Sequence, residues 1–249
     1  MLGKDGRKAF STASPELLRY IDRQRGVNEI PLIDNETHQV LYGIEALVAI
    51  IGQRCPFVRV LGKKQLVKWP LKKLYNFISY NRKVVVARKT HEGAIDCTPD
   101  FNIFYRLLFM GVFLCFNTLM LFPVHASLLA KIPVFNLSLF EFHMAHVGIV
   151  CINCLLATKL SRKEAIEYLG QVNMLALITI LLLLPLVLLN KWWLQSEVLN
   201  FIYLFLLTIF IIKEYFRRMD FAGVIKSYKA IVAINLASIA AFVGSLFVL

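Results

Sequence analysis

The chain has 249 residues, of which 58% are hydrophobic, and it carries a formal net charge of +12. Soluble domains are about 45–50% apolar, so this composition excludes an ordinary soluble globular protein. The apolar residues are concentrated after residue 102, whereas the first hundred residues are mixed and basic. The positive charge is accompanied by no nucleic-acid-binding motif, so we expect no nucleic acid partner.

The beginning of the chain predicts a small α/β domain over residues 1–62. Ser14 followed by Pro15 is typical of a helix N-cap and first helical position. In chain order, the patterning predicts a helix, two short strands and a second helix, over about 15–25, 29–33, 38–42 and 44–52. This order is that of the second half of a thioredoxin-like fold.

A family resemblance extends over residues 7–86. The runs STASPELLRYI, IPLID, VLYGIEALVAIIG and PLKKLYNFISYNRKVV resemble the carboxyl-terminal two-thirds of the DCC-type thiol–disulfide oxidoreductase family. The family's Asp-x-x-Cys-x-x-Cys motif would precede residue 7, and no cysteine matches it here. The resemblance implies a partial thioredoxin-like domain that either lacks its redox site or receives it from a start codon further upstream.

Residues 63–102 form a basic juxtamembrane segment. Its first part, KKQLVKWPLKKLYNFISYNRK, interleaves apolar side chains with lysine and arginine. Such a pattern is typical of an amphipathic helix on the anionic cytoplasmic leaflet of a membrane. The alternative is a helix that packs its apolar side on the amino-terminal domain and leaves the lysines in water. Both interpretations stay open, and both can hold at once.

The remaining residues, 103–249, predict a transmembrane domain of about five helices. Five apolar stretches approach or exceed the length that crosses about 30 Å of hydrocarbon, near 104–123, 138–158, 171–189, 197–214 and 228–249. The predicted fold class is an α-helical polytopic membrane protein with a small amino-terminal α/β domain. Four asparagines in these stretches are predicted to form hydrogen bonds that hold the bundle together: Asn117, Asn153, Asn173 and Asn235.

The distribution of basic residues predicts the orientation. Of 28 lysines and arginines, only Lys131 and Lys191 lie in the two connections expected on the outer side. The positive-inside rule then places the amino-terminal domain in the cytoplasm and the carboxyl terminus outside. We therefore predict a multi-pass protein of the bacterial inner membrane.

Cys151 and Cys154 have the spacing of a redox pair inside the second predicted span. A reactive dithiol needs a thiolate, which apolar surroundings and the carboxyl end of a helix both disfavour. We therefore interpret the pair as small residues for helix packing. A redox pair and metal ligation remain the alternatives.

Four ionisable residues could form a metal, haem or quinone-linked site near the outer ends of the first two spans: His125, Glu141, His143 and His146. Imidazoles with a carboxylate suit several transition metals, and ionisable groups in a membrane are often functional. The interpretation we favour is hydrogen bonding between helices or exposure at the interface. We therefore expect no cofactor, with a metal or haem as the alternative.

The sequence predicts an accessory or interaction subunit of a membrane protein complex rather than an enzyme. Its expected partners are the lipid bilayer and other membrane proteins. The first alternative is a membrane-bound thiol–disulfide oxidoreductase, which uses upstream cysteines or the pair Cys151 and Cys154. The second alternative is a metal- or haem-binding membrane subunit.

Overall fold

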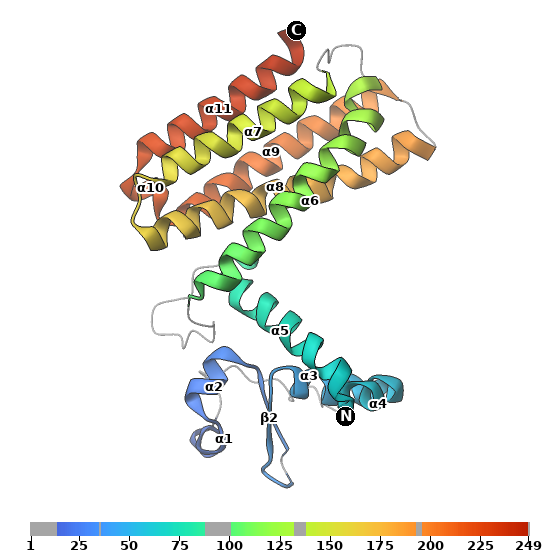
Figure 1. Cartoon of the computed structure of the whole chain (residues 1–249), viewed down its shortest axis with the longest axis vertical. Helices are drawn as coiled ribbons and strands as arrows, with labels where there is room; N and C mark the ends of the chain where they lie inside the picture. Colours follow the sequence, from blue (N-terminus) through green and yellow to red (C-terminus); the bar gives the residue numbers. More distant parts are fainter. Residues whose placement is uncertain (1–13, 35, 88–100, 132–137, 193–195, 249) are drawn as a thin grey trace. The chain divides into compact units, whose positions relative to one another are not determined.

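A computed structural model describes residues 14–34, 36–87, 101–131, 138–192 and 196–248 (Figure 1). The chain divides into two compact units, Met1–Tyr105 and Arg106–Leu249. The first unit contains α1 (Pro15–Tyr20), α2 (Arg23–Asn28), β1 (Pro31–Ile33), β2 (Val40–Tyr42), α3 (Ile44–Arg54), α4 (Pro56–Lys63) and α5 (Gln65–Val86). The predicted strands and second helix are confirmed, although the strands are shorter than expected.

The helix predicted over 15–25 is wrong in its length, because two short helices occupy this part of the chain. Ser14 caps α1 as expected, with its hydroxyl accepting a hydrogen bond from the Leu17 amide at 3.4 Å. Asp22 then adopts an extended conformation, and its carboxylate accepts from the amide of Gln24 at 2.9 Å. A second N-cap of this kind ends the first helix and begins another.

The two strands form an antiparallel hairpin in which Pro31 lies opposite Tyr42. Asp34 holds the turn, because its carboxylate accepts from the Glu36 amide at 3.0 Å. This hydrogen bond to the charged carboxylate lowers the pKa of Asp34. The predicted likeness of this unit to a thioredoxin fold stays a prediction.

The second unit is a helical bundle. Its elements are α6 (Ile103–Ser127, whose first turn belongs to the first unit), the 3-10 helix η2 (Leu129–Lys131), α7 (Leu139–Ala157), α8 (Arg162–Trp192), α9 (Glu197–Phe221), α10 (Val224–Ser227) and α11 (Lys229–Val248). Within the described residues, four of these helices are long and apolar enough to cross a membrane: Ile103–Ser127, Leu139–Ala157, Arg162–Lys191 and Val198–Phe221. The chain is thus a helical membrane protein with at least four candidate spans.

The fifth predicted span, 228–249, falls on α11. The described apolar part of this helix, Lys229–Ala241, is shorter than a membrane crossing requires, so the fifth span stays a prediction. Figure 1 shows α11 lying beside α7. The main apolar cluster of the unit lies where α7 and α9 end and where α8 and α11 begin: Ala157, Leu160, Tyr168, Leu175, Tyr215, Met219, Val224, Ile231 and Val232.

Three buried polar side chains connect helices of the bundle beside this cluster. The Tyr168 hydroxyl of α8 donates to the Asn153 side-chain oxygen of α7. The side-chain amide of Asn235 on α11 donates to the same oxygen and lies 3.3 Å from the Tyr168 hydroxyl. On the other side of α8, the Asn117 amide of α6 lies 3.3 Å from the Asn173 side-chain oxygen. The predicted role of the four asparagines is confirmed.

A charged cluster, consisting of Arg106, Glu167, Gln171, Glu214 and Arg218, joins α6, α8 and α9. Arg106 pairs with Glu167 at 3.2 Å, and Arg218 pairs with Glu214 at 2.8 Å. Gln171 links the two pairs, because its side-chain oxygen accepts from Arg218 at 2.7 Å and its side-chain amide donates to Glu167 at 3.5 Å. Glu214 is shared, because Arg217 also pairs with it at 2.6 Å.

Replacing Tyr168 by Phe removes the hydroxyl that connects α7, α8 and α11. We expect the free energy of unfolding to fall by about 1–2 kcal/mol, the upper range for hydrogen bonds between membrane helices. Titration with SDS in mixed micelles measures this change. Tyr215→Phe is the matched control, because this buried hydroxyl has no hydrogen-bond partner within the described part of the chain. Equal destabilisation by both changes would contradict the assignment.

Candidate functional site

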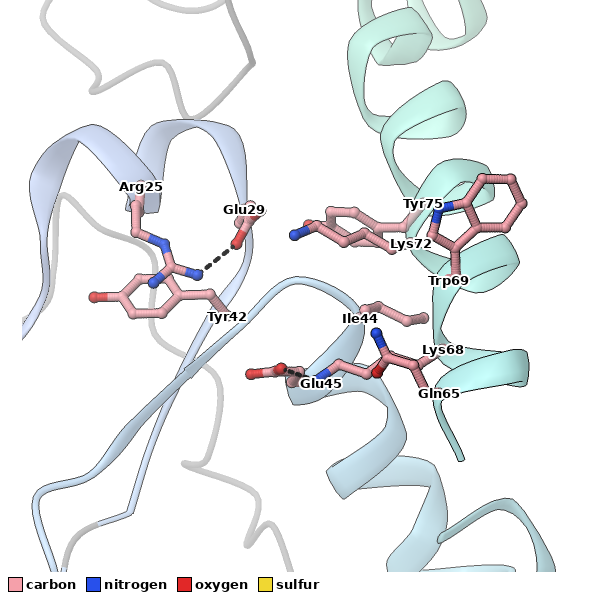
Figure 2. Close-up of a pocket in the computed structure, with 10 residues that line it drawn as sticks. All are labelled: Arg25, Glu29, Tyr42, Ile44, Glu45, Gln65, Lys68, Trp69, Lys72 and Tyr75. Atoms are coloured by element: carbon pink, nitrogen blue, oxygen red, sulfur yellow. Dashed lines mark hydrogen bonds and ion pairs between the residues drawn. The ribbon is translucent and has the colours of Figure 1, made fainter. Parts of the chain in front are cut away.

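The first unit contains a cavity of about 320 Å³ between α2, β2, α3 and α5 (Figure 2). Charged and aromatic side chains line this cavity, which is called the charged pocket below: Arg25, Glu29, Tyr42, Ile44, Glu45, Gln65, Lys68, Trp69, Lys72 and Tyr75. Three cations and two carboxylates therefore meet in one small space.

One wall of the pocket is formed by α2 and the end of β2. The Arg25 guanidinium lies 3.3 Å from the Glu29 carboxylate and stacks over the Tyr42 ring, 4.3 Å from its centroid. Tyr42 is itself held in place, because its hydroxyl accepts from the Asp22 amide at 2.8 Å. The salt bridge and the cation–π contact together fix the direction of Arg25.

The opposite wall is one face of α5, where Lys68, Lys72 and Tyr75 follow each other at helical spacing. Lys68 pairs with Glu45 at 2.5 Å, and the Tyr75 hydroxyl accepts from the Ile30 amide at 3.0 Å. Lys72 has no ion pair or hydrogen bond with another described side chain, and Figure 2 shows it directed toward the side of Glu29. Its ammonium group is therefore open to a ligand.

Gly43, between β2 and α3, allows the two walls to approach each other. It has φ +58 and ψ −122, a conformation that glycine adopts without strain. A Cβ atom at this position would lie 3.2 Å from Cε1 of Tyr75 and 3.3 Å from Cδ of Glu29. The space beside Gly43 is therefore kept free by the lack of a side chain.

The Tyr75 phenol is neutral at physiological pH. Burial raises the pKa of this group above its usual range, and the negative charge of Glu29 raises the pKa further. The lining residues include no cysteine, histidine, serine or threonine, and both carboxylates are paired with cations. The arrangement is suited to binding an acidic or hydrogen-bonding group, since it provides no activated nucleophile.

The cysteine pair lies outside this pocket. Cys151 and Cys154 are both exposed on α7, and both are free thiols. Asn153, which lies between them, is buried. The two cysteines therefore do not pack inside the described bundle, and their role in packing against another helix stays a prediction. A redox role for the pair stays the alternative.

Two of the four predicted metal or haem ligands are engaged within α7. The Glu141 carboxylate accepts from the Ser138 amide at 2.8 Å and from its hydroxyl at 2.6 Å, which forms a capping box. Nδ1 of His143 lies 2.8 Å from the Leu139 carbonyl oxygen.

The other two histidines have different neighbours. Nε2 of His146 lies 3.3 Å from the Thr118 hydroxyl of α6, as the interhelix interpretation predicts. The His125 ring packs 6.1 Å from the Phe142 ring, measured between centroids. Among the residues that the structure describes, no three His, Cys, Asp or Glu side chains are grouped as metal ligands. A metal or haem site at these residues stays an alternative.

The charged pocket was not predicted from the sequence, because its residues come from four elements between positions 25 and 75. The one local signal was the face of α5 that carries Lys68, Lys72 and Tyr75, which the basic character of the whole segment concealed. The charged cluster of the second unit was not predicted either. Its arginines lie at the ends of apolar spans, where they were counted only as determinants of orientation.

Comparison with known proteins does not identify the chain: no family model matches it, and no similar curated protein or solved structure was found. The resemblance to the DCC-type family depends on the sequence runs alone and stays a prediction.

Replacing Gly43 by Ala should close the charged pocket and strain the backbone. A non-glycine residue in such a conformation costs about 1–3 kcal/mol. Hydrogen–deuterium exchange of the full chain should show faster exchange in α2, α3 and α5. Gly223→Ala is the control, because Gly223 also has positive φ (+77) but a Cβ there meets no atom within 4 Å. Unchanged exchange around the pocket in Gly43→Ala would contradict this account.

Proposed function

We propose that the protein is a membrane-embedded accessory or interaction subunit of a membrane protein complex, which binds a partner through the charged pocket. The observation that carries this proposal is the open ammonium group of Lys72 in a cavity whose two carboxylates are already paired. The pocket therefore has an unused positive charge next to the neutral phenol of Tyr75.

The chemistry of the pocket fits an acidic side chain of a partner protein. A carboxylate could accept hydrogen bonds from Lys72, from the Gln65 amide and from Tyr75, and charge-assisted hydrogen bonds are the stronger kind. A volume of about 320 Å³ is at the lower end of the range for ligand sites. This size suits one or two side chains of a partner better than a large cofactor.

The proposed location is the inner membrane, with the amino-terminal unit in the cytoplasm. The concentration of cations on one side of the spans supports this orientation. The surface of α4 and α5 supports it further, because residues 56–86 contain eight lysines and arginines and no acidic residue. Such a surface is attracted to the anionic cytoplasmic leaflet.

Both sequence-based interpretations of this basic segment have support on α5. Its pocket face packs on the amino-terminal unit through Lys68 and Tyr75. On the other face, Leu66, Leu74 and Ile78 are exposed by 92%, 53% and 57%. These apolar side chains alternate with lysines, which is the composition of a helix that contacts a membrane surface.

Lys72→Glu should reverse the unused charge and release the partner. We expect at least a tenfold loss of the partner protein that co-purifies in mild detergent, because two carboxylates would then face each other. Quantitative mass spectrometry after cross-linking in native membranes measures the loss.

Lys73→Glu is the matched control for this experiment, since it makes the same charge change on the neighbouring residue, which does not line the pocket. Lys72→Arg should retain most of the binding. A monodisperse monomer without any partner, or equal effects of the changes at Lys72 and Lys73, would overturn the proposal.

A further inference from the structure

A second cavity, of about 670 Å³, lies between the end of α7 and the beginning of α11, within the second unit. Figure 1 shows these two helices side by side, with α10 at the end where α7 stops and α11 starts. Most of the lining is aliphatic. Ile231 is buried at its base, whereas Leu155 and Ile234 are exposed by 68% and 50%. The cavity is therefore an open apolar groove on a helix that can span a membrane.

The end of this groove at the helix termini is positively charged. Lys159 follows the last turn of α7, and Lys229 is the first residue of α11. Both are exposed, and neither side chain forms an ion pair or hydrogen bond with another described residue. Glu164, the next carboxylate along the chain after Lys159, is held by the Ser161 amide at 3.1 Å. The two ammonium groups are thus available to an anion.

An apolar groove with two cations at its membrane-surface end has the charge distribution complementary to that of an anionic lipid. We propose that it binds an anionic glycerophospholipid, with the phosphate at Lys159 and Lys229 and an acyl chain along Leu155, Ile231 and Ile234. Basic pockets between transmembrane helices are known to hold anionic headgroups. The proposal is independent of the charged pocket, which lies in the other unit.

The dimensions of the groove favour a lipid over a transmembrane helix of a partner. The lining on α7 extends from Ile152 to Lys159, which is about 10 Å at 1.5 Å per residue. A helix that crosses the membrane would need a contact surface closer to 30 Å long. An acyl chain, in contrast, can enter a short groove and leave its remaining length among the bulk lipids.

Selectivity should come from the lysines and not from the apolar walls. Bulk lipid is as apolar as the groove, so an acyl chain gains little by moving from one to the other. A lysine near the membrane surface favours an anionic over a neutral headgroup by a factor of about five. Removing both lysines should therefore abolish the preference while leaving the groove itself intact.

The test uses the full-length protein in nanodiscs of equal parts phosphatidylglycerol and phosphatidylcholine. Native mass spectrometry then counts the lipids that remain bound after the protein is released from the nanodisc. We expect the wild-type protein to retain phosphatidylglycerol with at least tenfold preference, and the double variant Lys159→Gln/Lys229→Gln to retain the two lipids equally. Lys213→Gln is the control, because this exposed lysine of α9 lies outside the groove and should preserve the preference.

Ile234→Trp provides a second measurement, since the larger side chain should fill the groove and remove bound lipid of both kinds. The proposal would be overturned if the wild-type protein retained the two lipids in the same ratio as the nanodisc contains them. It would also be overturned if the double variant kept the full preference for phosphatidylglycerol. An Ile234→Trp variant that loses an oligomeric state with no change in lipid retention would also overturn it, because a second copy of the chain would then occupy the groove.

Discussion

The second unit depends on the neutralisation of two arginines inside a helical bundle. Arg106 is 3% exposed and Arg218 is 1% exposed, and each pairs with a glutamate of the bundle. A buried charge without its partner destabilises a protein by about 3–5 kcal/mol, so α6 and α8 must meet in the register that brings Arg106 to Glu167. The other pair, Arg218 and Glu214, forms within α9, and the hydrogen bond from Arg218 to Gln171 connects α9 to α8. Gln171 connects the two pairs, because it accepts a hydrogen bond from Arg218 and donates one to Glu167.

The charged cluster lies at one end of the bundle, together with other polar side chains. The charged cluster, the hydrogen bonds among Asn153, Tyr168 and Asn235, and the two lysines of the lipid groove all lie where α7 and α9 end and α8 and α11 begin. Near the other end of α8, the side chains of Asn190 and Asn200 exchange hydrogen bonds between α8 and α9. The proposed orientation places the polar end at the cytoplasmic leaflet, where anionic headgroups are available to its exposed lysines.

Sequence reasoning succeeded where one physical requirement dominates a long stretch. Four apolar runs became long helices because a membrane leaves the backbone no other solution. The asparagines were found because polar groups in such helices need partners. Sequence reasoning failed where residues far apart in the chain form one site. The residues of the charged pocket come from four elements, and each element contributes too few of them to form a recognisable pattern. His143 and His146 show the opposite case, since their spacing suggested a shared ligand, yet each has a partner of its own.

The central claim is that the apolar helices span a membrane with the amino-terminal unit in the cytoplasm, and labelling of Cys55 tests it most directly. Cys55 is exposed. In one variant all other cysteines are replaced, so that Cys55 is the sole cysteine, and a membrane-impermeant maleimide is added to intact cells. In a second variant the sole cysteine is the one introduced at position 130. The account predicts labelling only after permeabilisation, whereas a cysteine introduced by Ala130→Cys, between α6 and α7, reacts in intact cells. Labelling of Cys55 from outside, with Ala130→Cys protected, would contradict it.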